Sequence, residues 1–320
     1  MKKCLHVLIV LSFLFAGCGF LAVQFAPKKQ AASLRSDAAI KGDELFWKVL
    51  HGGEYESIPD ALSALTAAYL ENPGDSITAS HIGFLHIWRL AERSRLDSLP
   101  ASITDHAVLA RRYFEESLQL NPSDARVLGF FGAAQLIEGT IHKDEKLTRR
   151  GYYTLLDAIY DWPEFNYFTA GYVMSGEPAN SANYKEALEW QWRTLDECAK
   201  EQVDRNNPDY AKYMHLQTRE GRKRVCWNSW IAPHNFEGFF LNMGDMLVKS
   251  GDWQTAQRIY ANAKLSPDYA NWRFRTVLER RIKEASENVP HFNPTGNPTG
   301  KDVRPIMLRS RFACMACHQE

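Results

Sequence analysis

The chain has 320 residues, of which 45% are hydrophobic, and it carries 38 basic and 38 acidic side chains. This length allows one long repeat domain or two ordinary domains. The formal net charge of zero gives no indication of a nucleic-acid partner. The 9 Trp, 13 Tyr and 17 Phe favour a folded body over a disordered one.

The N-terminus has the layout of a secretory signal, because Lys2 and Lys3 precede a mostly apolar run. The run ends in Leu14-Phe15-Ala16-Gly17-Cys18, which resembles the lipobox of bacterial lipoproteins. The resemblance implies cleavage before Cys18 and attachment of a diacylglycerol to its thiol. Gly19 follows, where an Asp would indicate retention at the inner membrane, so sorting to the outer membrane is compatible with this sequence.

Two alternatives remain for this segment. The apolar character continues to Ala26, and roughly 20 apolar residues are long enough for an uncleaved membrane anchor. A plain cleaved signal is the other alternative. In all three interpretations the remaining chain is exported, so we expect a cell-envelope protein that faces the periplasm. As a lipoprotein or with an uncleaved anchor, the protein would also be attached to a membrane.

The segment 27–42 is rich in Lys, Ala, Ser and Asp and is predicted to be a tether. From residue 43 to residue 288, apolar residues recur at three- and four-residue spacing between Pro and Gly breaks. This pattern predicts an all-α body, and it includes no convincing run of the period-two alternation that is typical of strands.

The clearest repeat in this body spans residues 235–268. Gly244 in its first half and Ala256 in its second half are small residues that let two helices approach, and Tyr260 is expected to fill the space between them. Pro267 ends the second helix because proline cannot continue a helix interior. This unit is similar to a tetratricopeptide repeat, in both length and pattern.

Weaker copies are marked by a helix–turn–helix junction. It occurs as Asn72-Pro73-Gly74-Asp75, as Asn121-Pro122-Ser123-Asp124 within a unit at 106–139, and in weaker form at Trp162-Pro163. Asp124 is a predicted N-cap. The spacing of the first two junctions predicts an insertion near residues 93–102. The resemblance covers most of residues 55–275 and implies stacked helix pairs with a concave surface that binds protein partners; the alternative is an irregular helical bundle without a groove.

The chain ends in Cys314-Met315-Ala316-Cys317-His318-Gln319-Glu320, and Cys-x-x-Cys-His resembles the attachment motif of c-type haem. The resemblance implies thioether bonds from Cys314 and Cys317, with His318 as the proximal iron ligand. The alternatives are a Cys314–Cys317 disulfide and a zinc site completed by a ligand from elsewhere.

The segment 289–320 is predicted to be an extended tail, because residues 289–304 are rich in Pro, Asn, Gly and Thr. Within it, Met307 and His291 are candidates for the sixth haem ligand, although each also fits an ordinary packing residue. An open sixth position is equally compatible with the sequence.

Cys198 and Cys226 remain in the exported body, where a disulfide is favoured over two buried thiols because export removes the reducing pool. The segment between them is polar and is expected to pack poorly by itself, with Arg222–Arg224 on a solvated face. His81 and His86 lie five residues apart on a predicted helix, which is poor spacing for metal ligands. We expect them to be surface or packing residues.

The sequence contains no phosphate-binding glycine loop, nucleophile elbow or His-Glu-x-x-His motif, and repeat scaffolds seldom carry catalysis. We therefore do not expect an enzyme. One hypothesis is an anchored scaffold that binds another envelope protein and carries a haem as a small module. The second is a monohaem electron-transfer protein that its helices dock to a redox partner. A third is a thiol–disulfide protein using Cys314 and Cys317.

Overall fold

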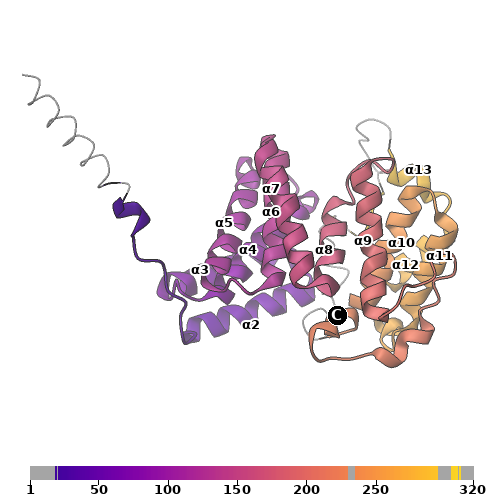
Figure 1. Cartoon of the computed structure of the whole chain (residues 1–320), viewed down its shortest axis with the longest axis horizontal. Helices are drawn as coiled ribbons and strands as arrows, with labels where there is room; N and C mark the ends of the chain where they lie inside the picture. Colours follow the sequence, from indigo (N-terminus) through magenta and orange to yellow (C-terminus); the bar gives the residue numbers. More distant parts are fainter. Residues whose placement is uncertain (1–18, 20, 230–234, 295–303, 309, 311–320) are drawn as a thin grey trace, which may run out of the picture.

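The computed structural model describes residues 19, 21–229, 235–294, 304–308 and 310, and within these ranges the chain is all-α with no strand (Figure 1). The helices are α2 (Asp37–Gly52), α3 (Ile58–Glu71), α4 (Ser76–Ala91), α5 (Asp105–Leu120), α6 (Ala125–His142), α7 (Glu145–Asp161), α8 (Pro163–Met174), α9 (Ala182–Ala199), α10 (Asn235–Ser250), α11 (Trp253–Asn262), α12 (Arg275–Lys283) and α13 (Asn288–Phe292).

Consecutive helices pack as antiparallel pairs, most extensively α4 with α5, α6 with α7, α8 with α9 and α10 with α11. The Asn-Pro junctions therefore connect one pair to the next, from α3 to α4 and from α5 to α6. The unit predicted at 106–139 joins α5, the second helix of one pair, to α6, the first helix of the next. The predicted repeat boundary is therefore offset by one helix from the observed pairing. The junctions break the helices as predicted, because the Asp75 and Asp124 side chains accept hydrogen bonds from backbone N–H groups in the first turns of α4 and α6.

The predicted insertion near residues 93–102 is present as a long connection between α4 and α5. It contains two 3₁₀ turns, at Arg93–Arg95 and Ala101–Thr104. The extra residues thus lie inside one helix pair, where they widen the loop without separating the two helices.

Glycines bring α6 and α7 into backbone contact. A Cβ atom on Gly151 would lie 2.7 Å from the amide nitrogen of Leu136 and 2.8 Å from the carbonyl oxygen of Gly132. The predicted contact in the α10–α11 pair has the same basis, since a Cβ on Gly244 would lie 2.2 Å from Cε1 of Tyr260. Tyr260 fills the space between these helices, as expected.

The body begins six residues earlier than the sequence pattern predicted, because α2 starts at Asp37 with Ser36 as its N-cap. The preceding segment lies on the body. Arg35 pairs with Asp75 at 2.9 Å, and Lys29 pairs with Glu116 at 2.6 Å. The C-terminal tail also differs from the prediction, because α13 occupies its first residues.

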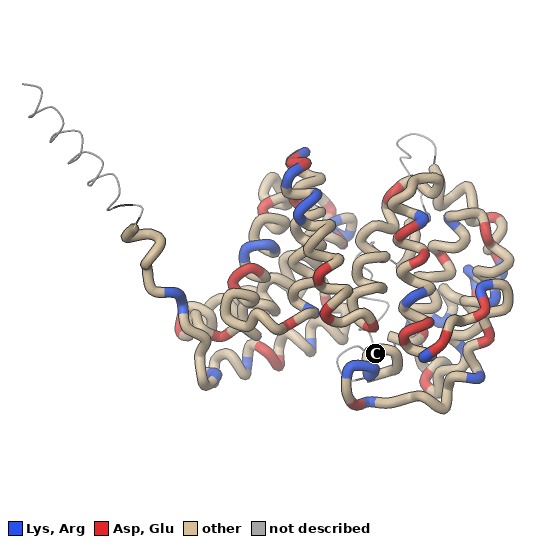
Figure 2. The backbone as a smooth tube through the Cα atoms, in the orientation of Figure 1, with Lys and Arg blue, Asp and Glu red and all other residues tan. Residues whose placement is uncertain are grey.

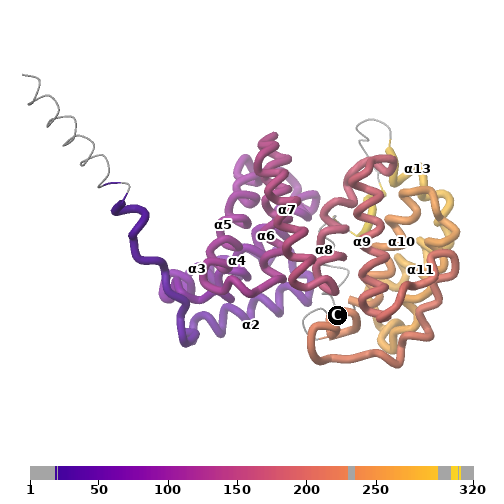
Figure 3. The backbone as a smooth tube through the Cα atoms, viewed as in Figure 1, coloured from indigo at the N-terminus to yellow at the C-terminus, as the bar shows by residue number. Residues whose placement is uncertain are grey.

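Two main apolar clusters form the core. One is contributed by α2 to α6, and the other by α7 to α13 together with Met307. The far end of α2 also reaches the second half of the molecule (Figures 1 and 3), where Arg273 donates to the carbonyl oxygen of Gly52, 221 residues away. The array therefore curves, and its two halves enclose a cavity.

We expect Gly151→Ala to destabilise the protein by about 1–3 kcal/mol, because the added methyl group would meet backbone atoms of α6 that cannot move aside. The shift in the urea midpoint measures this cost. Gly52→Ala is the matched control, since its methyl group would meet only the flexible side chain of Glu54. Equal midpoints for the two variants would contradict this account of α6–α7 packing.

Candidate functional site

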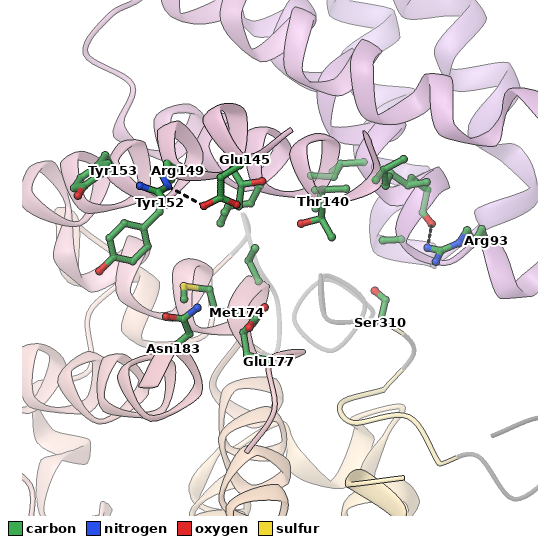
Figure 4. Close-up of a pocket in the computed structure, with 18 residues that line it drawn as sticks. Arg93, Thr140, Glu145, Arg149, Tyr152, Tyr153, Met174, Glu177, Asn183 and Ser310 are labelled. Atoms are coloured by element: carbon green, nitrogen blue, oxygen red, sulfur yellow. Dashed lines mark hydrogen bonds and ion pairs between the residues drawn. The ribbon is translucent and has the colours of Figure 1, made fainter. Parts of the chain in front are cut away.

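A cavity of about 630 Å³ lies between the two halves of the array (Figure 4). Its walls come from the ends of α4, α6 and α8 and from the start of α7, and Ser310 of the C-terminal tail lies at its border. This volume falls within the roughly 300–1,000 Å³ that is usual for sites of small molecules and cofactors.

The walls combine apolar and polar residues in similar measure. The apolar lining residues are Ile87, Leu90, Ala91, Leu136, Ile137, Ile141, Val173 and Met174. Arg93 and Arg149 supply positive charge at the border, and Glu145 forms an ion pair with Arg149 at 2.8 Å. Glu177 also lines the cavity, so the carboxylates of Glu145 and Glu177 balance the charges of the two arginines.

The tail reaches this cavity along a fixed path. Arg304 donates to Glu284 at 2.6 Å and to Asn288 at 2.8 Å, and Arg281 donates to the carbonyl oxygen of Pro305 at 3.0 Å. The next contact is the backbone N–H of Met307, which donates to Asp245 at 2.8 Å. We call these contacts of residues 304–307 the tail clamp.

Asp245 on α10 is the centre of the tail clamp. Its carboxylate is fully buried and accepts a hydrogen bond from the hydroxyl of Tyr260 at 2.6 Å. Arg281 on α12 lies 3.4 Å from the same oxygen. Burial raises the pKa of Asp245, and the charge of Arg281 acts in the opposite direction. Each carboxylate oxygen thus has a donor, which is what a buried charge requires.

Neither candidate for the sixth haem ligand lies at the cavity. Met307 is 0% exposed and packs in the core of the second half, and His291 lies on α13; neither lines the cavity. Cys18, Cys314, Cys317 and His318 lie outside the described residues. Asp245 could not be singled out from the sequence, because an aspartate inside a helical pattern carries no local signal of its partners.

Cys198 at the end of α9 and Cys226 form a disulfide whose Cα atoms are 5.7 Å apart. The segment that it closes is better packed than the sequence suggested. Tyr210 and Tyr213 are buried in it, Trp227 is buried directly after it, and the ring of Tyr210 lies 5.3 Å from that of Phe240 on α10. Aromatic burial, as well as the disulfide, therefore holds this segment on the helices.

The basic residues 222–224 contact the neighbouring helix in addition to solvent. The guanidinium of Arg224 lies 5.0 Å from the ring centroid of Trp162, and Arg222 donates to the carbonyl oxygen of Asp161. Figure 2 shows Lys and Arg interspersed with Asp and Glu along the helices, in line with the balanced charge of the chain.

His81 and His86 are packing residues. His81 stacks on Phe46 with ring centroids 3.9 Å apart and pairs with Asp43. His86 is largely buried, and its Nδ1 lies 2.8 Å from Nδ1 of His106 on α5. Burial, with a smaller contribution from His106, lowers the pKa of His86 to about 3. One imidazole of this pair must donate and the other accept, so the two rings cannot both be protonated.

Among the described residues, no group of three or more His, Cys, Asp or Glu side chains is arranged to hold a metal ion. In the same part of the chain, no helix combines the length and hydropathy needed to cross a bilayer. No protein-family model matches the chain, and no similar curated protein or solved structure was found.

Loss of the disulfide should cost about 2–4 kcal/mol, because the open loop regains conformational freedom in the unfolded state. A reductant should therefore lower the melting temperature of the native protein. The Cys198→Ser/Cys226→Ser variant should already have a lower melting temperature, and the reductant should not lower it further. A melting temperature of the native protein that is insensitive to reductant would contradict this prediction.

Stability should also fall as the pH decreases below 6.5. The unfolded chain then protonates His86, whereas the folded protein keeps it neutral down to about pH 3. The contribution is present above pH 6.5, and each pH unit below that value costs about 1.4 kcal/mol until the folded-state pKa is approached. His86→Gln keeps a polar partner for His106 and should flatten this slope in denaturant titrations. His215 is exposed, so the control variant His215→Gln should keep the pH dependence of the native protein.

Proposed function

We propose that this protein is an envelope-anchored helical scaffold that carries one covalent c-type haem on its C-terminal tail. The observation that carries the proposal is the tail clamp, which leads the chain to the border of the cavity four residues before Cys314.

The anchor is supported by the residues that follow the predicted signal. Leu21, Val23 and Phe25 are 51%, 73% and 81% exposed. Three large apolar side chains this close together are costly in water, and a membrane would remove that cost. The chain then joins the body through Lys29 and Arg35, so an anchored N-terminus would hold the helical array close to the membrane surface.

The haem is supported by the motif and not by the cavity. Cys314 and Cys317 would hold the group covalently, and His318 would be its proximal ligand, in keeping with the motif. A bound haem would supply one-electron chemistry.

Electron transfer is the second candidate function, and the tail clamp favours it as well. A haem on a tail that is fixed to the body as far as residue 307 would stay near any partner that the helices bind. A scaffold should keep its partner after Cys314→Ala/Cys317→Ala, whereas an electron-transfer protein should keep its fold and lose its redox activity. The thiol–disulfide alternative requires that no haem be attached to Cys314 and Cys317.

The test of the proposal is a pyridine haemochrome spectrum of protein exported from a host with haem c maturation. We expect a c-type spectrum that survives denaturation, since thioether bonds persist in the unfolded chain, and that disappears in Cys314→Ala/Cys317→Ala. Cys198→Ser/Cys226→Ser is the matched control and should retain the spectrum. A folded, matured protein without covalent haem would refute the proposal.

A further inference from the structure

We propose that the end of the array around residues 29–35 is a membrane-binding surface, on which Leu34 and Leu70 enter the headgroup region of a lipid bilayer. Residues 29–35, which we call the strap, hold this end of the body against the membrane. The inference rests on the membrane anchor of the proposed function and adds the face of the body that the membrane meets. It is independent of the haem.

The strap is fixed on the body along its length. The ammonium group of Lys29 donates to the hydroxyl of Tyr69 on α3 at 2.6 Å, and the backbone N–H of Ala32 donates to the carbonyl oxygen of Gly74 at 2.9 Å. Arg35 completes the contact through its ion pair at the start of α4. In Figure 1 the strap runs along the end of the array that is remote from α9 to α13. The chain that enters the body therefore has a fixed direction at this end.

Large apolar side chains are exposed around the strap. Leu34 in the strap is 82% exposed, and Leu70 in the last turn of α3 is 75% exposed. The two are neighbours, because the side-chain amide of Asn72 donates to the carbonyl oxygen of Leu34 at 3.1 Å. Ile40 and Ile77, in the first turns of α2 and α4, are exposed as well. In the described part of the chain, more than half of the exposed large apolar side chains lie here or within residues 21–25.

The connectivity of the chain brings a bilayer to this surface. The apolar N-terminal segment ends at Ala26, and the strap begins three residues later at Lys29. An extended chain spans at most about 3.3–3.6 Å per residue, so a membrane that holds the segment up to Ala26 lies within about 11 Å of the strap. The headgroup region adds roughly 5–8 Å on each side of the hydrocarbon core, so exposed leucines at this distance can reach it.

The attraction to the membrane is apolar and not electrostatic. The exposed basic residues Lys28 and Lys41 at this end of the array are balanced by the exposed acidic residues Asp37 and Glu71. An anionic headgroup would therefore gain little from the surface, whereas removal of leucine side chains from water is favourable in any bilayer. We expect the surface to bind neutral phosphatidylcholine and to be insensitive to salt.

The test places the full-length, exported protein in phosphatidylcholine vesicles whose acyl chains carry bromine, which quenches tryptophan emission at short range. Leu34→Trp and Leu70→Trp each add a tryptophan to the surface, and Tyr160→Trp, at an 88% exposed position on α7, is the matched control. Unbrominated vesicles correct for quenching within the protein, and the native protein corrects for its own tryptophans. We expect loss of the emission added at residues 34 and 70, and no loss at residue 160.

A second pair of variants, made in the Leu70→Trp protein, tests the strap. Lys29→Ala/Arg35→Ala removes its ion pairs and should restore the emission added at residue 70, because the body can then turn away from the bilayer while the anchor holds the chain. Lys41→Ala/Lys48→Ala removes the same charge outside the strap and should leave the quenching unchanged. Equal quenching in both would overturn the strap as the segment that orients the body.

The outcomes separate this inference from the proposed anchor. A native protein that does not float with the vesicles would refute the anchor before any variant is compared. A protein that floats, but whose added emission at residues 34 and 70 is unchanged by brominated lipid, would overturn the membrane-binding surface and leave the anchor in place. If that unquenched emission also shifts to the blue with rising protein concentration, a second copy of the chain covers the surface, which likewise overturns the inference.

Discussion

The buried carboxylate of Asp245 is the constraint on which the second half of the molecule depends. It joins α10 to α11 through Tyr260, to α12 through Arg281 and to the tail through the N–H of Met307. Burying a charge costs several kcal/mol unless its partners are well placed. Here the partners come from three separate segments, so the helices and the tail must adopt their mutual positions together. The path of the tail is therefore a property of the packed body and not of the tail alone.

This constraint connects the core to the cavity. The tail clamp determines where residue 310 lies, and the curvature of the array determines what it lies against. The ends of α4, α6 and α8 supply apolar walls there, while Arg273 brings the loop before α12 to the end of α2. The helix pairs bury their facing surfaces by stacking, and the cavity is the space that the stacking leaves between the two halves.

The sequence determined the features that depend on neighbouring residues. Helical periodicity, the caps at Asp75 and Asp124, the insertion after α4 and the fit of Tyr260 on Gly244 are set within one or two turns or within one helix pair. Only the tertiary structure decided which helices form each pair, because an Asn-Pro junction ends a helix without selecting its neighbour. It also decided the partners of Asp245, up to 62 residues away, and the walls of the cavity. Those contacts join residues far apart in the chain, and no local pattern encodes them.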